Sequence, residues 1–175
     1  MTSVTSVNPI AVPLDYNQFT QVQKYLFTDT QRHLIADVGI ILERLGEKDH
    51  ISDYSFIVSP AAKAYEGYLK DFFLKTNVID RYNYESDRFR VGKTLNPSLR
   101  YKRYSIFRRL ADLHPEGEAL AEVLWDAWKY GRNEIFHFFP NNFKHLDRRD
   151  AVDRIHLILT AIIQSGEFLK KNDIF

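Results

Sequence analysis

Three polar side chains suited to chemistry on a phosphate lie within one short segment, at Arg132, Asn133 and His137. Arginine carries a permanent cation whose planar fork matches phosphate oxygens. Histidine gives or takes a proton near neutral pH without extensive tuning. Because this combination suits phosphodiester cleavage where no metal site is present, the segment predicts proton transfer at a bound phosphate.

The spacing of these residues sets a geometric condition on the segment. Residues four apart share one face of a helix, so Asn133 is expected to hydrogen-bond to His137 and orient its ring. Arg132 lies five residues before His137, about 140° around an ideal helix. Either the Arg132 side chain curls back, or the helix distorts near Gly131. The simpler interpretation is a structural Arg132–His137 pair that closes a helix end.

A second polar group falls on a helix expected to begin at Ser59 and Pro60, since proline fits the first turn of a helix. Glu66 lies at the edge of the apolar face of this helix, one turn after Lys63 and one turn before Lys70. A surface ion pair with a neighbouring lysine is the simplest interpretation of Glu66.

The two segments together resemble the HEPN ribonucleases. Residues 59–67 read Ser-Pro-Ala-Ala-Lys-Ala-Tyr-Glu-Gly, and residues 132–137 read Arg-Asn-Glu-Ile-Phe-His. Residues 53–70 look like the first core helix of the toxin domain in RnlA/LsoA-type toxins, and the resemblance covers about residues 50–170. It implies an all-α, HEPN-type helical bundle that forms a twofold dimer with the active site at the interface.

The resemblance also implies roles for particular side chains. Glu66 belongs to the active site, and Lys63 stands where related toxins tend to have arginine. Arg132 holds the phosphate, His137 transfers protons, and Asn133 orients His137 or the substrate. The implied activity is metal-independent endoribonuclease cleavage of RNA through its own 2′-OH, without a cofactor. The implied setting is a toxin–antitoxin or antiphage defence system, with a neutralising antitoxin protein as partner.

Two other functions fit the same sequence. A non-catalytic HEPN-like helical module that binds a partner protein or a nucleotide needs the bundle and the dimer face, but not His137. An antitoxin-type inhibitor is the third possibility. RNA cleavage that persists in EDTA distinguishes the enzyme from both.

Composition favours one folded domain at residues 15–175, after an N-terminal arm at residues 1–14. The chain has 175 residues, of which 45% are hydrophobic and 14% aromatic. Its lack of cysteine excludes thiol nucleophiles and cysteine–zinc sites, and fits a cytoplasmic location. The histidines show no metal-binding spacing, and no apolar run reaches the roughly 18 residues of a membrane span.

A net charge of +1 hides an uneven distribution along the chain. Residues 81–109 contain nine Lys or Arg and two acids, whereas residues 110–128 contain five acids and no Lys or Arg. Aromatic residues alternate with the cations, which predicts RNA contacts that include Arg100, Lys102 and Arg103. The simpler interpretation is a solvated loop whose aromatic residues pack on the core.

Apolar periodicity predicts helices that must position these side chains. The expected helices cover residues 15–27, capped by Asp15; a second ending at Gly46; residues 59–74; one beginning at Ser98 or Ser105; one from Pro115 into the Arg132 motif; and one from Asp147 to Lys171. Residues 77–99 lack a helical period and predict an irregular connection, with a hairpin as the alternative.

Overall fold

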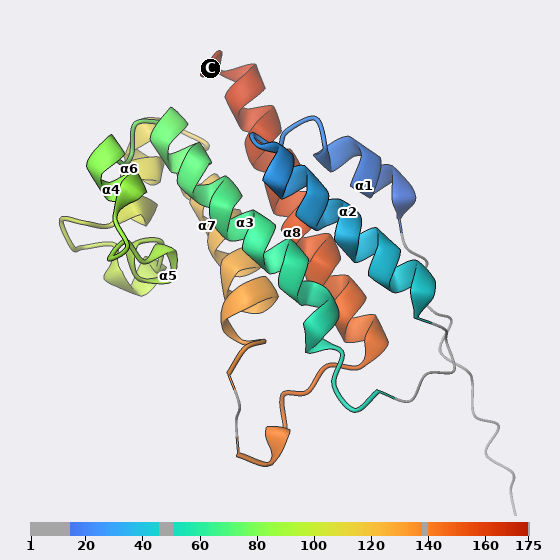
Figure 1. Cartoon of the computed structure of the whole chain (residues 1–175). Helices are drawn as coiled ribbons and strands as arrows, with labels where there is room; N and C mark the ends of the chain where they lie inside the picture. The colour runs from blue at the N-terminus through green and yellow to red at the C-terminus, as the bar shows by residue number, and fades with distance from the viewer. Residues whose placement is uncertain (1–14, 46–50, 138–139, 175) are drawn as a thin grey trace, which may run out of the picture.

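The computed structural model describes residues 15–45, 51–137 and 140–174, and within these ranges the chain is all-helical, without a β-strand (Figure 1). The all-α prediction is confirmed for this part of the chain. The expected arm at residues 1–14 and the expected C-cap at Gly46 lie outside the described residues.

Five helices form the body of the bundle: α1 (Tyr16–Val22), α2 (Asp29–Arg44), α3 (Ser55–Lys75), α7 (Gly117–Trp128) and α8 (Arg148–Lys171). Helix α3 packs against α2 and α8, α7 packs against α8, and α1 lies on α8 (Figure 1). The predicted apolar face of α3 is confirmed, since its members are fully buried: Ala61, Ala64, Tyr65, Tyr68, Leu69 and Phe72.

Side-chain caps explain where three of these helices begin. The Asp15 carboxylate accepts from the Asn17 and Gln18 amides at the start of α1, as predicted. Thr28 and Gln31 form a reciprocal capping box on α2. At α8, Asp147, where this helix was predicted to begin, is the cap and accepts from the Asp150 amide. Each cap satisfies N–H groups that the first helical turn leaves without a partner.

Helix α3 begins at Ser55, so the predicted start at Ser59 and Pro60 is wrong, and Pro60 lies inside the helix. The extra turn is stabilised by tertiary contacts, because Ile57 and Val58 are fully buried. The chain is also held just before the helix, where the Tyr54 amide donates to the Leu146 carbonyl at 2.9 Å. Burial therefore outweighs the local preference of proline for a first turn.

The predicted first helix is too long, because α1 ends at Val22 rather than at Phe27. Beyond α1 the chain turns, and the Phe27 ring stacks on Tyr68 of α3 with 5.0 Å between ring centroids. This aromatic contact requires Phe27 to leave the helical path. The free energy gained from packing Phe27 on Tyr68 explains why α1 ends before Phe27.

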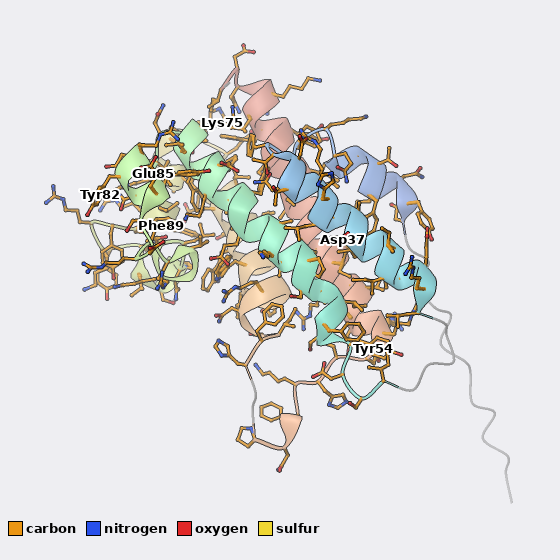
Figure 2. All side chains as sticks on the ribbon, in the orientation of Figure 1. Asp37, Tyr54, Lys75, Tyr82, Glu85 and Phe89 are labelled. Atoms are coloured by element: carbon orange, nitrogen blue, oxygen red, sulfur yellow. The ribbon has the colours of Figure 1, made fainter. Side chains whose placement is uncertain are left out.

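The basic stretch contains short helices rather than the alternative hairpin: α4 (Arg81–Glu85), α5 (Val91–Thr94) and η1 (Pro97–Leu99). Ser105, and not Ser98, caps the next helix, α6 (Ile106–Leu113), and α7 starts two residues after Pro115. Figure 2 shows Tyr82, Glu85 and Phe89 gathered beside the Lys75 end of α3, whereas Tyr54 marks its other end.

One polar network joins this stretch to the core. The Tyr84 hydroxyl donates to Asp71 Oδ1 at 2.8 Å, and the buried Gln31 side chain donates to Asp71 Oδ2 at 2.6 Å. The hydrogen bond to the Asp71 carboxylate, aided by burial, raises the pKa of Tyr84. A Cβ at Gly67 would lie 3.4 Å from the Gln31 amide nitrogen, which is ordinary van der Waals contact, so α3 passes close to this network.

Candidate functional site

The segment that carries Arg132 is a distorted helix. The α-helix α7 ends at Trp128, and one π-helical turn, η2 (Lys129–Asn133), follows it directly. The sequence required either a curled Arg132 side chain or a distortion near Gly131, and the structure contains the distortion. Single π-turns inside or after α-helices occur frequently at functional sites, because they re-aim side chains.

Close packing against α8 accounts for glycine at the centre of this turn. Gly131 is buried, and a Cβ there would lie 2.6 Å from Ile158 Cγ1 and 2.9 Å from Ile158 Cδ1. Only a residue without a side chain allows the backbone to approach Ile158 this closely. The backbone next to Arg132 is therefore packed closely against α8.

Arg132 points toward α3 and meets Glu66, which lies 66 positions earlier in the chain. Arg132 Nη2 lies 3.4 Å from Glu66 Oε2, and the two side chains are 37% and 41% exposed. The guanidinium carbon also lies 5.0 Å from the centre of the Trp128 ring, in a cation–π contact. Since only one guanidinium nitrogen lies within reach of Glu66, other N–H donors of Arg132 are left for a ligand.

A shallow pocket of about 220 Å³ joins these side chains. Its lining comes from one face of α3 and from the segment after α7: Ser59, Ala62, Lys63, Glu66, Arg132 and Phe136. Lys63 and Arg132 together carry two positive charges against the one negative charge of Glu66. The pocket is thus net cationic and suits a singly charged phosphodiester.

Glu66 was expected either to pair with a lysine of its own helix or to belong to a site with Arg132. Among the described ion pairs, its partner is Arg132. Lys70 lies 5.7 Å from the centre of the Tyr84 ring instead. The tertiary contact is therefore formed, and the surface pair within α3 is not.

His137 does not line this pocket in the described chain. The π-turn ends at Asn133, and Asn133 and His137 are both exposed. They do not share a helical face, and no hydrogen bond joins these two described side chains. Phe136, the residue before His137, lines the pocket, whereas His137 is not among the lining residues.

Residues 135–139 are apolar except for His137, and the described part of this stretch exposes one apolar side chain. Ile135 is 8% exposed and packs inward, whereas Phe136 is 46% exposed. Phe138 and Phe139 lie outside the described residues. Phe56, also 46% exposed, precedes Ser59 by three positions and so extends the same face of α3. Two exposed aromatic residues thus flank the pocket.

The predicted RNA-contacting cations lie elsewhere, around η1 and the start of α6. Arg100 Nη1 lies 3.2 Å from Glu118 Oε1, and Lys102 Nζ lies 4.7 Å from the centre of the Tyr101 ring. Arg103 is exposed. None of these three cations lines the pocket that contains Glu66 and Arg132.

Sequence reasoning missed Trp128 and Phe136 as parts of the site. Only Trp128 had a usable signal in its spacing. Trp128 precedes Arg132 by four positions, which brings an aromatic ring under the guanidinium on a helix. Phe136 follows Arg132 by four positions, but the helix ends between them, so only the tertiary structure brings it to the pocket.

In the part of the chain that the structure describes, no cluster of three or more histidine, aspartate or glutamate side chains could hold a metal ion. Among the same residues, no helix combines the length and apolarity that crossing a membrane requires. Comparison of the chain with protein-family models, with curated proteins and with solved structures gives no match.

Proposed function

We propose that the chain is a metal-independent endoribonuclease of HEPN type that cleaves RNA through the 2′-OH next to each phosphate. One observation carries the proposal: Lys63, Glu66 and Arg132 line a single net-cationic pocket, although they come from two distant segments. These are three of the five residues that the resemblance to HEPN ribonucleases implies for an active site, the other two being Asn133 and His137.

In this mechanism the 2′-oxygen attacks phosphorus, and the bond from phosphorus to the 5′-oxygen breaks. One proton leaves the 2′-OH and one proton is delivered to the 5′-oxygen. His137 transfers protons, since its side chain is exposed and it directly follows the pocket residue Phe136 in the chain. Arg132 and Lys63 hold the phosphate and stabilise the charge that develops on its oxygens. Glu66 orients the Arg132 guanidinium by the ion pair at 3.4 Å.

The direct test incubates the full chain with RNA in EDTA and identifies the product ends. We expect 2′,3′-cyclic phosphate and 5′-OH ends. His137→Ala should lower the rate about 10²- to 10⁴-fold, as removal of a positioned acid or base does. His33→Ala, an exposed histidine on α2, is the matched control and should retain activity. Products with 5′-phosphate and 3′-OH ends would contradict this mechanism.

Two proton transfers need two groups, and one chain offers one His137. We therefore propose that two chains form a twofold dimer that places both pockets in one cleft. The exposed Phe56 and Phe136 beside the pocket support a contact surface there. Specific activity should fall on dilution below the dimer dissociation constant. A monomer whose specific activity is constant on dilution would refute the shared site.

The resemblance to RnlA/LsoA-type toxins further supports a role as toxin or effector in a toxin–antitoxin or antiphage system. Expression of the wild-type chain should then arrest growth of a bacterial host, and His137→Ala should relieve the arrest. If a well-folded wild-type chain binds RNA or a nucleotide and never cleaves it, the non-catalytic HEPN-like module is the correct function instead.

A further inference from the structure

A second cavity, of about 310 Å³, lies where the segment after η1 meets α6 and the first turn of α7. Its lining combines cations, acids and aromatic rings: Arg100, Tyr101, Phe107, Arg108, Ala111, Asp112 and Glu118. The buried Phe107 ring and Ala111 form its apolar part. Neither the resemblance nor the proposed mechanism assigns any role to this cavity.

An aromatic ring at the mouth of the cavity is available for stacking. Tyr101 is 67% exposed, and the ammonium group of Lys102 lies 4.7 Å from the centre of its ring. A planar ligand can stack on such a tyrosine, as unpaired bases do on exposed aromatic residues. The nearby cation favours a ligand that also carries negative charge.

Two exposed ion pairs cross the cavity wall. Arg100 Nη1 lies 3.2 Å from Glu118 Oε1, and Arg108 Nε lies 3.4 Å from Asp112 Oδ2. All four side chains are more than half exposed, so each pair is weak and its arginine can exchange partners at little cost. The guanidinium groups can therefore bind a phosphate while the carboxylates accept hydrogen bonds from a ligand.

The arginines, carboxylates and tyrosine ring of this cavity together restrict the chemical class of ligand that it can bind. An acidic peptide would be repelled by Asp112 and Glu118, and a basic peptide by Arg100 and Arg108. A nucleotide carries its negative charge on the phosphate and presents an uncharged base. Among the bases, guanine has adjacent N1–H and N2–H donors that match a carboxylate acceptor, whereas uracil has one N–H between two carbonyl acceptors.

We propose that this cavity binds one unpaired guanine nucleotide of the RNA, with the base stacked on Tyr101 and its N–H edge on a carboxylate. Glu118 is the carboxylate in the first turn of α7. The proposal rests on the proposed ribonuclease function, and it adds a base preference at a site separate from the Glu66–Arg132 pocket.

The geometry of α7 relates the two sites. Glu118 and Arg132 are 14 residues apart, along α7 and the π-turn that follows it, which is about 20 Å along the helix axis. A strand that runs along α7 would pass from Tyr101 to Arg132. At about 3.4 Å per stacked nucleotide, the guanine should lie roughly six nucleotides from the cut, and fewer if the strand is extended.

The test titrates the full chain with 5′-GMP and with 5′-UMP and follows backbone amide signals by NMR. GMP should shift signals around Tyr101 and Ala111 and bind about tenfold more tightly than UMP. Tyr101→Ala should weaken GMP binding about tenfold, through the lost stacking. Tyr16→Ala, another exposed tyrosine, is the matched control and should leave GMP binding unchanged.

Equal affinities for GMP and UMP, no binding at millimolar nucleotide, or shifts confined to the Lys63–Arg132 pocket would overturn the proposal. Nucleotide binding requires no cleavage, so its outcome is independent of the ribonuclease test. A chain that cleaves RNA without binding GMP at Tyr101 refutes only the guanine site. A chain that binds GMP there without cleaving RNA refutes only the ribonuclease.

Discussion

The packing of Gly131 against α8 gives the most direct test of how the Arg132 segment is built. In Gly131→Ala, the new Cβ would lie 2.6 Å from Ile158 Cγ1 and 2.9 Å from Ile158 Cδ1. Ile158 is fully buried, so its side chain has little space to withdraw. The π-turn must therefore shift, or the side chain of Ile158 must leave its preferred rotamer.

The expected loss of stability is the difference between two opposing effects. Overpacking costs about 1–3 kcal/mol, and replacing glycine in a helix regains about 0.5–1 kcal/mol. The difference spans about 0–2.5 kcal/mol, and we expect a net loss near its middle, about 1 kcal/mol. For a chain of this length, a loss of about 1 kcal/mol lowers Tm by about 2–4 °C.

Gly39→Ala is the matched control, because Gly39 lies within α2 and a Cβ added there would meet no atom within 4 Å. At Gly39 the only expected effect is the higher helix propensity of alanine, so the free energy of unfolding should rise by about 0.5–1 kcal/mol. Adding Ile158→Ala to Gly131→Ala removes both contacting atoms. The double variant should lose less stability than the sum of the two single variants.

Thermal unfolding followed by circular dichroism measures the stability of these four variants against the wild type. If Gly131→Ala is as stable as the wild type, or if its effect adds simply to that of Ile158→Ala, the close contact between the π-turn and α8 is refuted. Under the proposed function, Gly131→Ala should also lower RNA cleavage beyond its unfolded fraction. A displacement of about 1 Å at a catalytic group can cost about 10²-fold in rate.

Two further predictions concern the scaffold. Tyr84→Phe removes the hydrogen bond to Asp71 and should destabilise the chain by about 1–2 kcal/mol at neutral pH. Because that bond raises the pKa of Tyr84 above 10.0, its stabilisation is present below pH 10 and is lost as the pH rises through the folded-state pKa. The difference in Tm between the wild type and Tyr84→Phe should thus narrow above pH 10. A difference that does not change with pH would contradict the hydrogen bond from Tyr84 to Asp71. Asp147→Ala removes the cap of α8 and should cost about 1 kcal/mol in chemical denaturation, whereas Asp153→Ala, an exposed aspartate on the same helix, should cost less.

The sequence alone determined those features that depend on neighbours along the chain. Asp15 was predicted as a cap because a carboxylate bonds to amides two or three residues away, and the last helix was predicted to begin at Asp147. The apolar face of α3 was predicted because helical periodicity brings residues three and four apart to one side. The cap and the apolar face both depend on the geometry of a single helix, and not on which other helices it contacts.

Only the tertiary structure decided the partner of Glu66. Lys63 and Lys70 lie one turn away on the same helix, yet the ion pair is formed with Arg132, 66 positions away. The early start of α3 at Ser55 likewise depends on burial of Ile57 and Val58 in the core. The π-turn that aims Arg132 depends on contact between Gly131 and Ile158 of α8. Periodicity along one helix carries no information about the second helix that it meets, and these three features all arise where two helices touch.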